Sequence, residues 1–235
     1  MNAATRQRRS LAVHLVAIVS CVMVLGVPTS WAGSPGIGSG SILLQPIARE
    51  LSAEWWQLFL SLPAAENPLL DDSGARCVSG QRGPVWFLVG AFGDPVTREC
   101  SIPEGTALFI PLINGVDVNT SSQSASELRA EIDQCIDATT TLTLVVDGHA
   151  VPRREIMRVR SRVFAVSLPD DNVLGLPAGT YSPAVDDGYY ALLAPLGVGQ
   201  HTVHFTAARG GCPISPDPFS LDVTYKLTVV PVSLH

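Results

Sequence analysis

The sequence predicts a mainly β protein: a disulfide-bonded two-sheet β-sandwich, jelly-roll-like or Ig-like, with one or two short helices. Many short apolar segments are separated by Gly, Pro, Asp and Asn, which is typical of strands and turns. Helical patterns are few, so a sandwich is favoured over alternating strands and helices. The predicted strands are 85–89, 107–111, 142–146, 157–166, 189–193, 200–206 and 221–230.

The last of these segments carries the clearest strand pattern. Apolar residues alternate with polar ones from Leu221 to Val229, so that one face is predicted to be core and the other to meet solvent. A second local signal is Asp147-Gly148, which lies between Val146 and Val151 and predicts a tight hairpin turn.

Two helices are predicted. The first begins at Ser52 as N-cap and runs through Leu62, with aromatic and apolar residues at helical spacing and Pro63 after it. The second begins at Ser124, because Ser124 and Glu127 have the form of a capping box. Its apolar face holds Leu128, Ile132 and Cys135.

The N-terminal residues 1–32 have the organisation of a cleaved signal peptide. Three arginines precede an apolar run from Leu11 to Val27, and small residues follow it. A membrane anchor is less favoured, because the run is shorter than the roughly 20 residues that span a bilayer. The pair Arg8-Arg9 leaves twin-arginine export open, and a lipoprotein-like box leaves a lipid anchor on Cys21 as the less favoured alternative.

A flexible Gly/Ser lead is predicted for residues 33–41, and a single β-sandwich domain for 42–235. No second stretch is apolar enough to predict a transmembrane segment. The expected location is therefore secreted, either extracellular or periplasmic.

Four cysteines remain after the predicted signal: Cys77, Cys100, Cys135 and Cys212. An even number in an exported protein predicts two disulfides. Of the three connectivities, Cys77 with Cys100 and Cys135 with Cys212 is favoured, because the first pair closes a short loop. Zinc is not expected at these cysteines, since there is no C-x-x-C pair and no histidine close to them.

Net charge restricts the partners. Without residues 1–32 the chain carries 12 basic and 21 acidic residues, and 12 minus 21 gives a net charge of −9. Binding to nucleic acid or to anionic membranes needs an excess of basic surface. Neither is therefore expected as a partner of the whole protein.

The region between residues 50 and 115 holds a series of motifs: Glu66 to Asp71, Cys77, Gly80 to Leu88, Arg98 to Cys100, and Ile102 to Gly105 before Phe109 to Pro111. Together they resemble a family of uncharacterised secreted bacterial proteins. The similarity extends more weakly to 188–190 and 199–205. It implies a secreted, disulfide-bonded domain and transfers no catalytic residue.

The strongest candidate ligand site is basic. Arg158, Arg160 and Arg162 alternate with Met157, Val159, Ser161 and Val163, so that on a strand the arginines would form a ladder on its solvent face, about 6.6 to 7 Å apart. Such a ladder is either neutralised by acids on a neighbouring strand, the favoured interpretation, or binds an anion. An anionic polysaccharide or another envelope component is the most concrete partner that it suggests.

Trp56 is a second candidate, because an exposed indole can stack on a sugar ring. Core packing is the favoured role of Trp55, Trp56 and Trp86, and the stacking hypothesis requires one indole to stay exposed. His201 and His204 are not expected to bind metal, since residues three apart on a strand point to opposite faces.

These observations predict a non-catalytic binding or structural protein of the bacterial envelope or exterior, with no cofactor and no metal. The alternative is a glycan-acting hydrolase with a carboxylate pair about 5 to 9.5 Å apart. Its candidate residues are Glu54, Asp71, Asp72, Asp117, Asp186 and Asp187.

Overall fold

The structure is a computed structural model that describes residues 41–232. The predicted signal peptide with Cys21, and residues 33–40 of the predicted lead, lie outside the described residues. The strands are β1 Val85–Phe87, β2 Val96–Pro103, β3 Ala107–Val118, β4 Thr139–Val146, β5 His149–Ala150, β6 Met157–Arg160, β7 Phe164–Leu168, β8 Gly179–Leu193, β9 Gly199–Arg209 and β10 Phe219–Val230. The α-helices are α1 Ser41–Leu60 and α2 Ala125–Asp137, and short 3-10 turns lie at Ala64–Glu66, Pro68–Leu70 and Arg153–Glu155.

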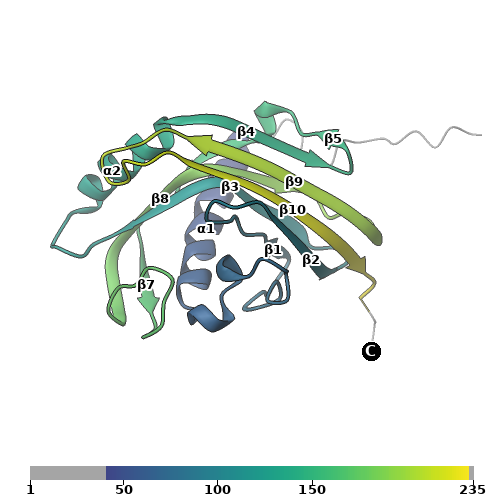
Figure 1. Cartoon of the computed structure of the whole chain (residues 1–235), viewed down its shortest axis with the longest axis horizontal. Helices are drawn as coiled ribbons and strands as arrows, with labels where there is room; N and C mark the ends of the chain where they lie inside the picture. The colour runs from purple at the N-terminus through teal and green to yellow at the C-terminus, as the bar shows by residue number, and fades with distance from the viewer. Residues whose placement is uncertain (1–40, 233–235) are drawn as a thin grey trace, which may run out of the picture. The chain divides into compact units, whose positions relative to one another are not determined.

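The strands form two five-stranded sheets, which confirms the predicted two-sheet sandwich (Figure 1). Sheet A has the order β1-β3-β8-β6, with β7 also paired to β8. Sheet B has the order β2-β10-β9-β4-β5. Each sheet contains one parallel pair, β1 with β3 and β2 with β10, and the other pairs are antiparallel.

The main hydrophobic core fills the space between the sheets. Sheet A contributes Leu108, Ile110 and Leu193, and sheet B contributes Phe205 and Val223, all of them almost fully buried. The apolar face predicted for the last strand is confirmed: every second residue of β10 from Leu221 to Val229 is buried.

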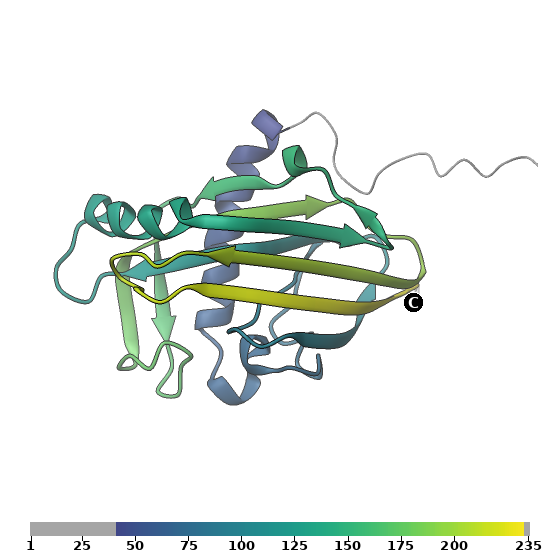
Figure 2. The same ribbon diagram turned by 45° about the horizontal axis from the view of Figure 1, so that its top comes forward.

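The other face of sheet A is covered by α1, which makes three layers (Figures 1 and 2). Trp55 and Phe59 of α1 pack there with Phe109 and Tyr190 of the sheet. The prediction that this helix begins at Ser52 is wrong, since the helix already includes Ser41 and Ser52 is buried in its middle. The aromatic and apolar residues at helical spacing do form the buried face of α1, but Ser52 faces the sheet and does not cap the helix.

The end of α1 is fixed by a buried side chain. The helix ends at Leu60, and Asn67 donates a hydrogen bond of 2.7 Å to the Phe59 carbonyl oxygen. The Asn67 side chain also accepts from the Leu69 backbone N–H at 3.0 Å. One amide therefore satisfies a free carbonyl of the helix and starts the next turn, as expected at helix ends.

Two local predictions are confirmed by the structure. Ser124 and Glu127 form the reciprocal capping box of α2, and Leu128, Ile132 and Cys135 of that helix are buried. Asp147 and Gly148 both have positive φ angles, 49° and 78°, and connect β4 to β5 in a tight hairpin. These are the dihedral signs that a type I′ turn requires.

The strand limits differ from the sequence-based ones. The segment 157–166 is two strands, β6 and β7, that both pair with β8. Strand β2 was not predicted, because its buried positions include an arginine and a cysteine in place of a run of aliphatic residues. Strand β8 extends ten residues further toward the N-terminus than the predicted 189–193.

Both predicted disulfides are confirmed. Cys77 is bonded to Cys100, which ties the loop after α1 to β2, and Cys135 is bonded to Cys212, which ties α2 to the β9–β10 connection. Such bonds fit an exported protein in an oxidising compartment. Within residues 41–232, no helix is long and apolar enough to cross a membrane.

We predict that the two disulfides contribute unequally to stability. The Cys135–Cys212 bond spans 77 residues and the Cys77–Cys100 bond spans 23, so the loop-entropy relation gives about 4.5 and about 3.4 kcal/mol. Replacing Cys135 and Cys212 by Ser should therefore lower the free energy of unfolding more than the same change at Cys77 and Cys100. Urea denaturation of the two double variants measures this, and the reverse order would contradict it.

Candidate anion-binding site

The site is built around two adjacent aspartates in β8. Asp186 and Asp187 are both fully buried. Because neighbouring residues of a strand point to opposite faces of the sheet, the two side chains contact different parts of the protein. Asp186 faces α1, where it bonds Trp56. Asp187 faces the side covered by α2, where it bonds Arg158 of the neighbouring strand β6.

The Asp187 carboxylate holds Arg158 in a forked arrangement. Arg158 Nε lies 3.2 and 3.1 Å from the two carboxylate oxygens, and its Nη2 lies 2.6 Å from Oδ2. Burial raises the pKa of Asp187 to about 6; the bonds from Arg158 lower it, and the nearby Asp133 raises it. The same carboxylate raises the pKa of Arg158, so this guanidinium is permanently charged.

The three arginines predicted as a ladder each have an acidic partner. Arg158 also bonds Asp137 of α2, Arg160 bonds Asp133 of α2 at 3.1 Å, and Arg162 bonds Glu50 of α1. The expectation of one continuous exposed ladder is wrong. Strand β6 ends at Arg160, so Arg162 lies outside it, and the Arg158 side chain is only 27% exposed.

Arg158 and Arg160 nevertheless line an open pocket with two further arginines. The pocket has a volume of about 350 Å³ and is lined by Gln45, Arg49, Arg129, Arg158 and Arg160. Arg49 lies on α1 and Arg129 on α2. Sequence reasoning missed both, since each is a lone arginine in a helix and only the packing of α1 and α2 brings them to β6.

Arg129 is the most unusual member of this arginine pocket. Its Nη2 donates to the Ser161 carbonyl oxygen at 2.6 Å, whereas its buried Nη1 has no hydrogen-bond partner among the described residues. Burial and the positive charge of Arg49 lower the pKa of Arg129, whereas the charges of Asp133, Asp186 and Asp187 act against this shift. In the part of the chain that the structure describes, no carboxylate lies within 4 Å of Arg49 or Arg129. Two such guanidinium groups favour an anion between them.

On the opposite face of β8, Asp186 joins the sheet to α1. Its Oδ1 accepts hydrogen bonds from Trp56 Nε1 at 2.8 Å and from the Tyr190 hydroxyl at 2.6 Å. Burial raises the pKa of Asp186 to about 7, although the bonds from Tyr190 and Trp56 act against this rise. Trp56 is only 9% exposed. The hypothesis of an exposed sugar-stacking indole is therefore wrong, as Trp56 packs and donates inside the protein.

The carboxylates proposed for a hydrolase lie apart. Asp71 bonds the backbone of its own loop at Ser73 and Arg76, and Glu54 lies on the side of α1 that faces a different pocket. Asp117 contacts Glu131 of α2, and burial together with that charge raises its pKa to about 6. Asp186 and Asp187 point to opposite faces of one sheet, so these two do not flank a common cleft.

His201 and His204 of β9 each contact a different aspartate. His201 Nδ1 lies 2.7 Å from Asp147, and His204 Nε2 lies 2.9 Å from Asp222. Among residues 41–232, no cluster of three His, Cys, Asp or Glu side chains could hold a metal ion.

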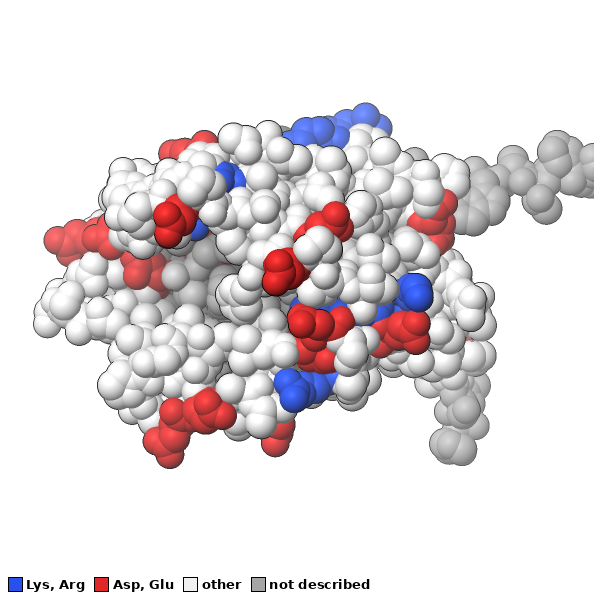
Figure 3. Space-filling model, viewed as in Figure 1, with Lys and Arg blue, Asp and Glu red and all other residues white. Residues whose placement is uncertain are grey.

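On the face shown in Figure 3, acidic side chains are scattered over the surface and basic ones are few.

Fold and site define a disulfide-bonded β-sandwich protein with an arginine-lined pocket at the meeting point of α1, α2 and sheet A. Comparisons of the chain with protein-family models, with curated proteins and with solved structures found no match.

We predict that Asp186 makes stability depend on pH. Its folded pKa lies above its unfolded value, so the folded state binds the proton more tightly, and the free energy of unfolding should fall as pH rises from about 4 to about 7 and then level off. Asp186→Asn keeps an oxygen to accept from Trp56 and Tyr190 but cannot ionise. Relative to wild type, the variant should gain stability between pH 5 and pH 8.

Urea denaturation of both proteins at the two pH values measures this difference. Titrating groups that do not interact with Asp186, such as Asp117, are the same in both proteins and cancel in the comparison. Parallel pH profiles would contradict a raised pKa at Asp186.

Proposed function

We propose that the protein is a secreted, non-catalytic binding protein of the bacterial envelope or exterior, whose arginine pocket holds an anionic group of an envelope polysaccharide. The observation that carries this proposal is that Arg49 and Arg129 both line the pocket and neither forms an ion pair among the described residues. A carboxylate or sulfate group is the kind of ligand that two such guanidinium groups favour.

The charge balance of the pocket supports an anion over other ligands. Arg158 pairs with Asp137 and Asp187, and Arg160 pairs with Asp133. Arg49 and Arg129 form no ion pair among the described residues, although Asp133, Asp186 and Asp187 act on the charge of Arg129 at longer range. The planar guanidinium matches carboxylate and sulfate oxygens in a forked geometry.

The surroundings favour a local anionic group over a long run of phosphates. The chain without residues 1–32 has a net charge of −9, which opposes non-specific binding of nucleic acid. The pocket is open and of limited volume, about 350 Å³. A sugar carboxylate or sulfate on a flexible polysaccharide can enter such a pocket while the rest of the chain stays in solvent.

We expect Arg129→Gln to weaken the binding of sulfated and carboxylated polysaccharides about tenfold, because it removes charge-assisted hydrogen bonds. Isothermal titration at low and moderate salt measures this, with a neutral glycan as negative control. Arg154→Gln is the matched control, since the Arg154 side chain is 80% exposed and outside the pocket. Equal affinities of wild type and Arg129→Gln, or no binding of any anion, would refute the proposed site.

A second substitution should act in the opposite direction. Asp137 competes for Arg158 and is 60% exposed, so Asp137→Asn should leave the fold intact and free one guanidinium face. We expect the affinity for the same polysaccharides to rise about two- to fivefold, the range of an exposed ion pair. A weaker or unchanged affinity would show that Arg158 does not contact the ligand.

A further inference from the structure

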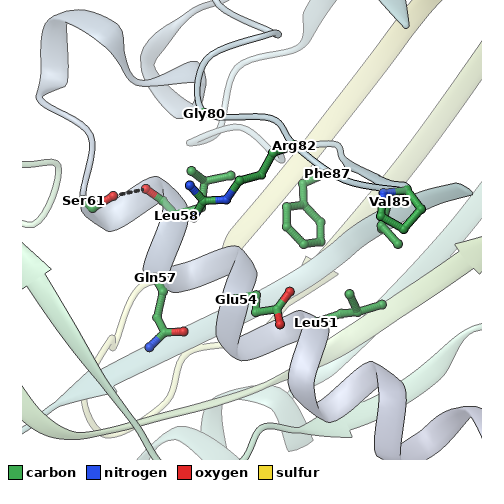
Figure 4. Close-up of a pocket in the computed structure, with 10 residues that line it drawn as sticks. Leu51, Glu54, Gln57, Leu58, Ser61, Gly80, Arg82, Val85 and Phe87 are labelled. Carbon is green, nitrogen blue, oxygen red and sulfur yellow. Dashed lines mark hydrogen bonds between the residues drawn. The ribbon is translucent and has the colours of Figure 1, made fainter. Parts of the chain in front are cut away.

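A larger pocket lies between α1 and the chain that leads into β1. Its volume is about 500 Å³, within the range of about 300 to 1,000 Å³ typical of small-molecule sites. Figure 4 shows side chains of α1 facing those of residues 80–87 across it. The apolar part of the lining is Leu51, Leu58, Val85 and Phe87, and it shares no residue with the arginine pocket.

The wall opposite α1 is held in place by a side-chain clamp. Gln81 Nε2 donates to the Phe87 carbonyl oxygen at 2.7 Å, and Gln81 Oε1 accepts from the Phe87 N–H at 3.0 Å. The Gln81 amide thus takes the place of a neighbouring strand at the open edge of β1. The Cys77–Cys100 disulfide fixes the start of the same segment.

Gly80 sets how closely this wall approaches α1. It has a positive φ of 70°, and a Cβ there would lie 2.4 Å from Leu58 Cδ1. A larger residue would be strained at this φ and would have to displace the end of the Leu58 side chain. The clamp, the disulfide and Gly80 together keep the pocket walls in position without a ligand, which lowers the entropic cost of binding.

Opposite charges stand on the two walls. Glu54 projects from α1 and Arg82 from the facing segment, and both line the pocket (Figure 4). Neither side chain has an ion pair or a hydrogen bond within residues 41–232, so the two do not neutralise each other. A ligand with a cationic and an anionic end and an apolar middle complements this arrangement.

We propose that this pocket binds a short apolar peptide in its zwitterionic form. The ammonium group pairs with Glu54, the carboxylate pairs with Arg82, and the apolar side chains lie on Leu51, Leu58 and Phe87. A single small ion would leave the apolar lining exposed to water, and a neutral glycan would offer neither Glu54 nor Arg82 a partner of opposite charge. The proposal is independent of the arginine pocket and of its ligand.

The test uses the dipeptide Leu-Leu and two capped forms, one N-acetylated and one C-amidated. NMR titration of the protein with each peptide measures affinity and locates the binding surface. We expect the free dipeptide to shift resonances of α1 and residues 80–87. Each cap should weaken binding about two- to fivefold, the effect of one exposed ion pair.

Matched variants assign each end. In Glu54→Gln, N-acetylation should no longer weaken binding, whereas C-amidation should still weaken it. In Arg82→Gln, C-amidation should no longer weaken binding, whereas N-acetylation should still weaken it. Both side chains are exposed, so an unchanged Tm confirms intact folding, and Arg154→Gln is the surface control. Equal binding of capped and free peptides, or no shift at these residues at millimolar peptide, would overturn the proposal. Either result would leave the arginine pocket unaffected, because that site is tested with Arg129→Gln.

Discussion

Two consecutive carboxylates of one strand join sheet A to both α-helices. Asp186 receives Trp56 from α1, and Asp187 receives Arg158 of β6, which in turn contacts Asp137 of α2. A buried carboxylate is costly unless it is protonated or paired. The two residues meet this requirement differently, because burial raises the pKa of Asp186 to about 7 whereas Asp187 has a guanidinium partner.

Much of the fold could be predicted because its signals are local. The β10 alternation, the Asp147-Gly148 turn and the Ser124 capping box each depend on a few neighbouring residues, and the structure has all three. The cysteine pairing was also predictable, since the number of cysteines and a short loop favoured it. Where signals were not local, prediction failed. Ser52 has the residue type of a helix cap, yet tertiary packing buries it in the middle of α1.

Only two of the four arginines of the pocket could be predicted from the sequence, because the other two are not related by any local pattern. Arg158 and Arg160 stand two apart in one strand, so their spacing predicts a shared face. Arg49 and Arg129 are separated by 80 positions from each other and lie on different helices. No spacing rule relates them, and only the docking of both helices beside sheet A places them in one pocket.

Neutralisation and anion binding, which the sequence left as alternatives for these arginines, are compatible in the folded protein. Burying Asp187 requires a cation, and Arg158 supplies it; Arg160 likewise pairs with Asp133. Those pairs fix the geometry of the pocket wall without using Arg49 or Arg129. In the proposed site, the paired arginines therefore fix the wall, and Arg49 and Arg129, which form no ion pair among the described residues, provide the attraction for an anion. Because the ion pairs already order this wall in the absence of ligand, binding an anion there requires little further loss of side-chain conformational entropy.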